Sequence, residues 1–206
     1  MVRAARRTAG ASGRRFNIIY ADPPWHYQSW ARRSSAAGEG GRTGRGVPYP
    51  TMPTSAICAL PVAELAAQDA LLFLWATYPM LPDALRVIGS WGFAYKGVAF
   101  TWCKLNPSGV GWHFGLGYWT RGNPEICLLA TKGRPRRQSR KVANLVVSPR
   151  REHSRKPHEV RERIVALCGD LPRVELFARQ KTPGWSAWGN EVDSDIALTG
   201  RDQRAA

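Results

Sequence analysis

Short apolar runs separated by turn residues recur along the chain and predict buried strands. The first run extends from Phe16 to Ala21 and stops at Asp22-Pro23, because proline has no N–H to donate to a strand ladder. Further runs predict strands over 70–75, 93–103, 125–131, 144–147 and 173–177, of which 93–103 is rich in aromatic and β-branched residues. Such continuous apolar runs are typical of strands covered on both faces.

Helical patterns alternate with these strands. Residues 79–90 form an amphipathic pattern whose apolar face is predicted to contain Leu81, Leu85 and Ile88. A second helix is predicted over 157–168, with proline in its first turn and glycine after its end. Strands that alternate with helices predict an α/β fold with a doubly wound, mostly parallel sheet of the Rossmann-like kind.

The domain organisation follows from where the patterns begin and end. Residues 1–15 predict a disordered basic arm, residues 16–192 one globular domain, and residues 193–206 a flexible polar tail. Within the domain, residues 28–47 form a long loop rich in glycine, serine and arginine, and residues 105–123 form an irregular aromatic segment. Long loops inside compact domains are usually functional or disordered.

The net charge of the chain bears on its binding partner. The 206 residues carry a net charge of +15, from 30 Lys and Arg against 15 Asp and Glu. This imbalance favours a polyanion as partner, since each phosphate that a cation neutralises releases condensed counterions. Arginine and alanine bias in a GC-rich genome is an alternative source of the same charge. Charge alone therefore gives only a modest preference for nucleic acid as partner.

Composition also excludes several classes of protein. No apolar stretch is long enough to span a bilayer, and the basic N-terminus lacks the apolar core of a secretory signal, so a cytoplasmic protein without membrane contact is expected. Four cysteines are scattered without a CxxC pair, and the histidines lack the spacing of metal ligands; neither a disulfide nor a metal site is predicted.

The candidate chemistry lies in Asp22-Pro23-Pro24-Trp25, directly after a buried strand. Ligands bind at the carboxyl ends of strands in open α/β sheets. The Asp22 carboxylate and the Pro23 carbonyl can accept the two N–H bonds of an adenine amine, and the prolines hold these acceptors rigid. Trp25 offers a face on which an extruded base can stack. A plain strand-ending turn is the alternative interpretation.

The chain resembles the DPPW amino-methyltransferases, a permuted group that includes the catalytic subunit of the eukaryotic messenger-RNA adenosine methyltransferase. The resemblance covers roughly residues 16–192 and rests on an ordered series of motifs: YADPPW at 20–25, YPTM at 49–52, LLFLW at 71–75, GYWTRGNPEICLLATKG at 117–133, HSRKPHE at 153–159, VELFAR at 174–179 and GWSAWGNE at 184–191. It implies S-adenosyl-L-methionine as cofactor. No glycine-rich GxG fingerprint follows an early strand, which departs from common nucleotide-binding patterns.

The resemblance implies roles for individual residues. Asp22, Pro23, Pro24 and Trp25 match the catalytic tetrapeptide, and Tyr49 matches a tyrosine near the target adenine. Lys156 matches a lysine that pairs with the methionine carboxylate of the cofactor. Other implied cofactor contacts are Asp22, Arg179, Lys181, Asn190 and Glu191. The eukaryotic enzyme has histidine where Lys181 stands.

Three further groups of residues are candidates from their chemistry. Glu175, near the end of an apolar strand, can bind ribose hydroxyls or equally pair with an arginine. Trp119, Arg121 and Asn123 can line the pocket of the target base, or form a buried aromatic turn. The basic segment 133–141, together with Arg150 and Arg151, is predicted to hold phosphates, although charge runs are usually solvated faces.

These observations predict an S-adenosylmethionine-dependent methyltransferase for the exocyclic amine of adenine in nucleic acid. DNA is favoured over RNA because the chain is compact and contains no recognisable RNA-binding module. An RNA adenine methyltransferase, a noncatalytic nucleic-acid-binding relative, and a methyltransferase for small molecules or proteins are the alternatives. The sequence leaves open whether a partner subunit takes part.

Overall fold

A seven-stranded sheet forms the centre of the protein. The computed structural model describes residues 14–26, 50–115, 117, 119–151 and 155–198. Its elements are β1 (Phe16–Ala21), α1 (Thr54–Cys58), α2 (Val62–Leu65), β2 (Ala66–Ala76), the 3-10 helix η2 (Tyr78–Met80), α3 (Leu81–Ser90), β3 (Ala94–Leu105), β4 (Glu125–Lys132), β5 (Leu145–Pro149), α4 (Glu159–Cys168), β6 (Arg173–Leu176) and β7 (Ser186–Trp188).

The strand order is β5-β3-β4-β2-β1-β6-β7. Neighbouring strands pair in parallel except at β4, which is antiparallel to both β2 and β3. The predicted α/β fold with a mostly parallel sheet is therefore confirmed. Because β4 runs against the others, its first residue lies at the edge where β1, β2 and β3 end.

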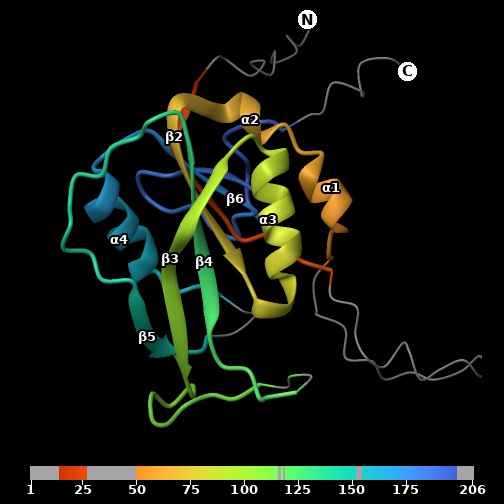
Figure 1. Cartoon of the computed structure of the whole chain (residues 1–206), viewed down its shortest axis with the longest axis vertical. Coiled ribbons are helices and arrows are strands. Elements are labelled where there is room, and N and C mark those ends of the chain that lie inside the picture. Colours follow the sequence, from red (N-terminus) through yellow and green to blue (C-terminus); the bar gives the residue numbers. More distant parts are fainter. Residues whose placement is uncertain (1–13, 27–49, 116, 118, 152–154, 199–206) are drawn as a thin grey trace, which may run out of the picture.

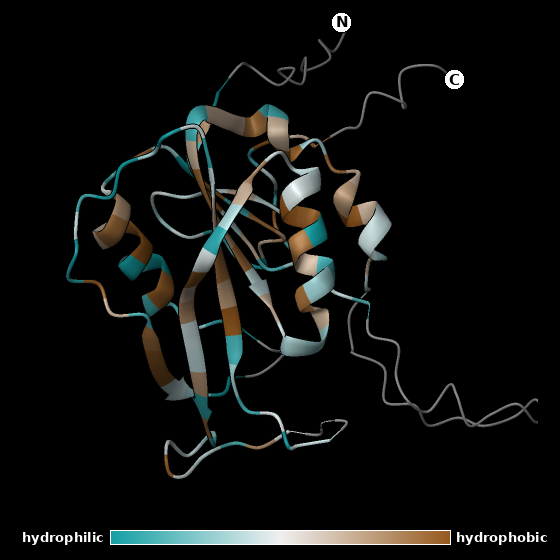
Figure 2. Ribbon diagram, viewed as in Figure 1, coloured by the Kyte–Doolittle hydropathy of each residue, from teal (hydrophilic) through white to brown (hydrophobic). Residues whose placement is uncertain are grey.

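Helices cover both faces of the sheet, as a doubly wound fold requires. Ile18 and Tyr20 of β1 pack with α4 on one face, while Ile19 and Ala21 pack with α1 and α3 on the other. In Figure 1, α1 and α3 lie together on one side and α4 lies apart from them on the other. Figure 2 shows apolar colours concentrated on the central strands and on parts of the helices. The alternation follows from the two-residue period of strand side chains.

The helix predicted over 79–90 divides into η2 and α3, and its buried face differs from the prediction. Ala84, Val87 and Ile88 are the buried residues of α3, whereas Leu85 remains 39% exposed. The apolar face is therefore centred on a small alanine, which allows the helix to approach the sheet closely. The sequence pattern placed Leu85 on that face incorrectly.

The second predicted helix is confirmed as α4, which ends at Gly169. This glycine has φ of 90°, a conformation that side chains with a Cβ rarely adopt. A Cβ there would also meet the Gln138 side chain at 2.4 Å. Gly169 thus stops the helix and leads the chain into β6.

The structure describes only parts of the predicted N-terminal arm and C-terminal tail. Residues 1–13 of the predicted arm and 199–206 of the predicted tail lie outside them. Beyond residue 192, Asp195 accepts a hydrogen bond of 2.9 Å from the Ala187 backbone N–H, and Ile196 and Leu198 pack against the core. No helix in the described part of the chain is long and apolar enough to cross a membrane.

Replacement of a buried leucine of β2 tests the importance of this core. Leu72→Ala is expected to lower the free energy of unfolding by about 2–5 kcal/mol, because it leaves a cavity between sheet and helices. The matched control is Leu85→Ala, on the exposed side of α3, which is expected to lower the free energy of unfolding by less than about 1 kcal/mol. Urea denaturation measures both, and equal costs would contradict the described packing.

Candidate active site

A cleft of about 120 Å³ opens at the edge where the parallel strands end. The Asp22-Pro23-Pro24-Trp25 turn after β1 forms one wall, and Phe177, Arg179, Asn190 and Glu191 after β6 and β7 form the other. Glu125 and Lys156 lie between the two walls. The predicted catalytic turn and most of the predicted cofactor residues therefore share one cavity.

The catalytic turn is held by backbone and indole hydrogen bonds. The Trp25 N–H donates to the Pro23 carbonyl at 2.8 Å, which makes a tight turn centred on Pro24. The Pro24 carbonyl accepts the Met52 N–H at 2.8 Å. The Trp25 indole donates to the Trp75 carbonyl at 3.0 Å, and only 4% of this residue is exposed. Trp25 is thus a fixed wall of the cleft that leaves little surface for stacking of a base.

Four charged side chains form a linked series, of which Asp22, Lys156 and Glu125 line the cleft and Lys104 does not. The Lys156 ammonium lies 2.8 Å from the Asp22 carboxylate and 3.1 Å from Glu125 Oε2. Glu125 Oε1 in turn accepts a hydrogen bond of 2.6 Å from Lys104, the penultimate residue of β3. We call Asp22, Lys156, Glu125 and Lys104 the charge chain.

The members of the charge chain differ in their exposure to water. The side chains of Lys156 and Glu125 are nearly buried, whereas 30% of the Asp22 side chain is exposed toward the cleft. Lys156 also lies 5.6 Å from the centre of the Trp75 ring, and Lys104 lies 5.3 Å from that of Trp102. Each ammonium thus lies near one indole, and Asp22 is the most exposed member of the charge chain.

The charge chain shifts the proton affinities of its members. Removal from water raises the pKa of Asp22 above its ordinary value, and the ammonium of Lys156 limits this rise. Removal from water acts in the same direction on Glu125, but Lys156 and Lys104 outweigh it and lower the pKa of that carboxyl. Burial opposes the charge of Lys156, yet Asp22 and Glu125 together raise its pKa. Lys156 and Glu125 are therefore charged at neutral pH.

The opposite wall contains the backbone strain of the site. Phe177, directly after β6, has φ of 61° and is the one non-glycine residue with positive φ in the described ranges. Its ring meets Trp188 edge-on at 5.4 Å between ring centres. Strained residues persist only where surrounding packing holds them, and they gather at ligand sites. Nearby, Arg179 Nε lies 3.6 Å from Glu191 Oε1.

Glu175 takes the second of its two predicted roles. Arg161 of α4 binds its carboxylate through two nitrogens, with Nε 2.7 Å from Oε2. The Arg161 guanidinium lies 5.3 Å from the Tyr20 ring centre, and all three side chains are near a small cavity beside the cleft. Glu175 is therefore paired with an arginine inside the fold.

Several predicted site residues lie away from the cleft. Lys181 forms an ion pair of 2.6 Å with Asp195 and does not line the cavity. Trp119 is 99% exposed, so it forms neither a pocket wall nor a buried turn. Arg121 donates to the Phe114 carbonyl at 2.8 Å on the surface. Tyr49 lies outside the described residues.

Asn123 has a structural task at the base of the loop between β3 and β4. Its carbonyl oxygen accepts the Lys104 N–H at 2.9 Å, and its amide donates to the Lys104 carbonyl at 2.8 Å and to the His113 carbonyl. These bonds fasten the end of the loop to the end of β3. Asn123 is two residues before Glu125 in the sequence but, unlike Glu125, does not line the cavity.

The sequence interpretation missed Glu125, Lys104 and Phe177. The available signal for Glu125 was an acidic residue at the start of the apolar run ICLLA. A charge at such a position is ordinarily solvated at a strand end. Only the reversed direction of β4 brings it to the cleft. The positive φ of Phe177 has no counterpart in the sequence pattern.

Acid titration of unfolding tests the charge chain. Because the folded pKa of Glu125 is lowered, its stabilisation is fully present above the ordinary value of 4.5 and is lost as pH falls through the folded pKa. Glu125→Gln is expected to cost about 3 kcal/mol at pH 7 and progressively less below pH 4.5. Urea denaturation across this range measures it, with exposed Glu162→Gln as control. A cost that does not change with pH would refute the pairing.

Comparison with known proteins shows which family the chain resembles. The family MT-A70 matches residues 16–191. The type II methyltransferase M.MunI of Mycoplasma sp is 33% identical over 199 residues, covering 90% of this chain and 82% of that protein. The N(6)-adenosine-methyltransferase MT-A70-like protein of Arabidopsis thaliana is 29% identical, covering 86% of this chain and 24% of that protein.

A human relative shows the same partial coverage. The N(6)-adenosine-methyltransferase catalytic subunit METTL3 of Homo sapiens is 26% identical, covering 87% of this chain and 28% of its own length. The chain thus spans about a quarter of these eukaryotic relatives and most of the bacterial one. With a family match along residues 16–191 and the DPPW turn at the cleft, the chain belongs to the MT-A70 family and is a methyltransferase.

Proposed function

We propose that this protein transfers a methyl group from S-adenosylmethionine to the exocyclic amine of adenine in DNA. The observation that carries the proposal is the Asp22 carboxylate, which faces the cleft while Lys156 holds it from behind at 2.8 Å. An acceptor fixed in this way needs no rearrangement when a substrate amine arrives.

The amine of adenine is a poor nucleophile because its lone pair is delocalised into the ring. A carboxylate that accepts one N–H bond favours a tetrahedral nitrogen with a localised lone pair. Asp22 is suited to this task, and its raised pKa also suits it to hold the proton that the amine releases. Since the Pro23 carbonyl already accepts the Trp25 N–H, its second lone pair is the one proposed for the substrate.

The second wall of the cleft fits the proposed cofactor. When bound, S-adenosylmethionine supplies a methyl group on a sulfonium centre. Asn190 and Glu191 offer an amide and a carboxylate for ribose hydroxyls, and Phe177 and Trp188 offer aromatic surface. Lys156 and Arg179 provide cations for the methionine carboxylate. The remaining predicted contact, Lys181, is expected to take part only if its pair with Asp195 opens.

DNA is the proposed substrate because of the relative that matches along most of its length. The term type II methyltransferase belongs to DNA modification enzymes, and the chain covers 82% of M.MunI. RNA is the second candidate, since the eukaryotic relatives carry the name N(6)-adenosine-methyltransferase, but the chain covers only about a quarter of them. The net charge of +15 supports a nucleic acid in either case.

Methyl transfer by an Asp22 variant tests the proposal. Asp22→Asn keeps an oxygen for Lys156 but removes the negative charge and the proton acceptor, so methyl transfer is expected to fall at least about 100-fold. Radiolabelled cofactor with genomic DNA or RNA from a methylation-free host, followed by nucleoside analysis, measures product and substrate preference. Asp170→Asn, 86% exposed and before β6, is the control.

The outcome of this experiment decides between the alternatives. Wild-type activity on DNA that Asp22→Asn abolishes supports the proposal. If the wild type prefers RNA, the substrate class changes from DNA to RNA. If the wild type is inactive on both nucleic acids, or if Asp22→Asn is as active as wild type, the proposal is overturned.

Calorimetric titration with S-adenosylmethionine tests the cofactor wall. Asn190→Ala is expected to weaken binding by about tenfold, because one hydrogen bond to the ribose is lost. Asn144→Ala, an exposed residue just before β5, is expected to bind as wild type. Equal affinity of both variants would remove Asn190 from the cofactor site.

A further inference from the structure

The loop between β3 and β4 presents aromatic side chains to solvent. We call residues 106–124 the aromatic loop; 116 and 118 lie outside the described residues. Trp119 is 99% exposed, Trp112 52% and Phe114 48%. Exposed apolar groups of this size in close succession mark interaction sites, whereas single exposed residues do not.

Hydrogen bonds hold the described part of the aromatic loop in place. Beyond the Asn123 contacts with Lys104 and His113, the Gly115 N–H donates to the Gly122 carbonyl at 2.7 Å. Trp112 forms an isolated antiparallel bridge with Leu105, the last residue of β3. The loop therefore has an anchored base from which the aromatic groups project.

The surroundings of the aromatic loop are cationic. The loop contains no acidic residue. The Arg121 guanidinium lies 5.9 Å from the Phe114 ring centre, and the Arg150 backbone is joined to Leu105 by a hydrogen bond of 3.0 Å. The pKa of His113 is lowered, first by burial and then by the neighbouring charges of Arg150, Lys104 and Arg121. Charge of this sign selects a polyanionic partner over a protein surface of the same kind.

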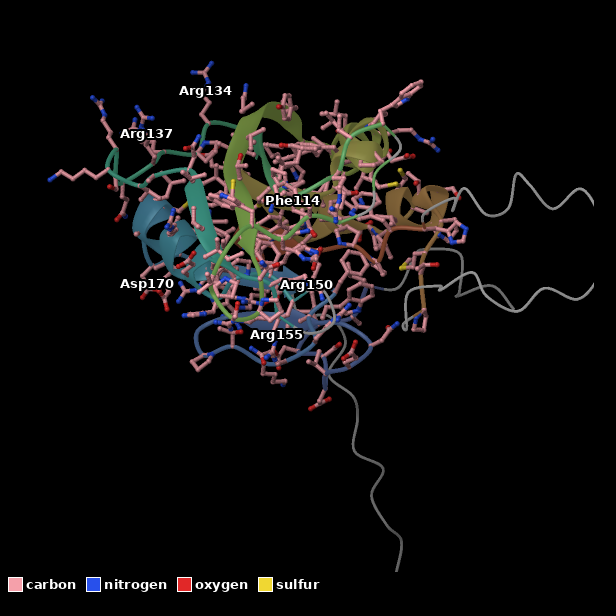
Figure 3. All side chains as sticks on the ribbon, turned by 90° about the horizontal axis from the view of Figure 1, so that it is seen from below. Phe114, Arg134, Arg137, Arg150, Arg155 and Asp170 are labelled. Carbon is pink, nitrogen blue, oxygen red and sulfur yellow. The ribbon has the colours of Figure 1, made fainter. Side chains whose placement is uncertain are left out.

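The aromatic loop lies at the same sheet edge as the cleft. It follows the end of β3 and precedes Glu125, which lines the cleft, and in Figure 1 it hangs below the strands. Figure 3, seen from below, shows Phe114, Arg150 and Arg155 near the middle of the view, apart from Arg134 and Arg137. Aromatic and cationic groups thus lie at the same end of the sheet as the cleft.

The basic segment 133–141 lies elsewhere. It follows the end of β4, at the edge opposite the cleft, and its Gln138 N–H donates to the Leu167 carbonyl near the end of α4 at 2.8 Å. Its Arg134 N–H donates to Asp69 at 2.7 Å, and Figure 3 shows Arg134 and Arg137 away from Phe114. The sequence prediction grouped this segment with Arg150 and Arg151, and the strand directions separate the two.

We propose that the aromatic loop binds the nucleic acid next to the target adenine, with Trp119 stacking on a neighbouring base and Arg121 and Arg150 contacting phosphates. Every base has a face that an indole can cover, so this contact adds affinity without fixing the sequence. An exposed indole can also occupy space in the stack that an extruded base leaves. The inference rests on the proposed function, since it assumes a nucleic-acid substrate.

Fluorescence anisotropy with a labelled 20-base-pair, adenine-containing DNA duplex tests the stacking contact. Trp119→Ala is expected to weaken binding by about tenfold. Tyr95→Ala is the matched control: this aromatic residue is 45% exposed but lies at the start of β3, at the opposite edge. Affinity for S-adenosylmethionine, measured separately by calorimetry, is expected to be unchanged in both variants.

A pair of arginine variants tests the phosphate contact. Arg150→Gln is expected to weaken binding several-fold and to reduce the slope of log affinity against log salt by about one. Arg137→Gln removes an equal charge from the opposite edge and is expected to change the slope less. Equal effects of the two variants would show that the overall charge, and not this site, binds DNA.

Separate readouts distinguish failure of this inference from failure of the proposed function. If wild type methylates DNA but Trp119→Ala binds and methylates equally well, the loop contact is refuted and the proposed function stands. If wild type neither binds nor methylates nucleic acid, the proposed function fails. If Trp119→Ala converts a dimer to a monomer in sedimentation while DNA affinity per subunit is retained, the loop is a surface for a second copy and the inference is overturned.

Discussion

The charge chain at the cleft joins the parts on which the site depends. Asp22 follows β1, Lys104 lies next to the last residue of β3, Glu125 starts β4 and Lys156 precedes α4. Four segments distant in sequence therefore meet through ion pairs of 2.6 to 3.1 Å. Nearly buried charges are tolerated only when paired and hydrogen-bonded. The charge chain satisfies that condition among its own members and leaves Asp22 as its one partly exposed carboxylate at the cleft, so stability and the proposed chemistry use the same contacts.

The reversed direction of β4 decides what surrounds that carboxylate. An antiparallel strand starts where its parallel neighbours end, which brings Glu125 to the cleft and the aromatic loop to the same end of the sheet. The same reversal sends the basic segment 133–141 to the opposite edge. The basic segment 133–141, which is a dense run of positive charge in the sequence, therefore lies away from the site.

The two walls of the cleft differ in character, in keeping with two proposed ligands. The DPPW turn is rigid and rich in acceptors, and its tryptophan is almost fully packed. The wall after β6 and β7 combines a strained Phe177 with an amide, a carboxylate and a guanidinium. As a member of the MT-A70 family, the protein is a methyltransferase. In the proposed function, the DPPW turn binds adenine and the other wall binds the cofactor.

The sequence by itself determined most of the strands, the two longer helices, the α/β class and the family, whereas the roles of Asp22 and Lys156 stay predictions. Apolar periodicity and proline or glycine at element ends are local properties, and the ordered motifs are properties of the chain. Only the tertiary structure decided that Glu125 and Lys104 complete the site, that Arg161 pairs with Glu175, that Lys181 turns to Asp195, and that Trp119 faces solvent. These outcomes depend on strand order, strand direction and long-range contacts, which a local pattern does not specify.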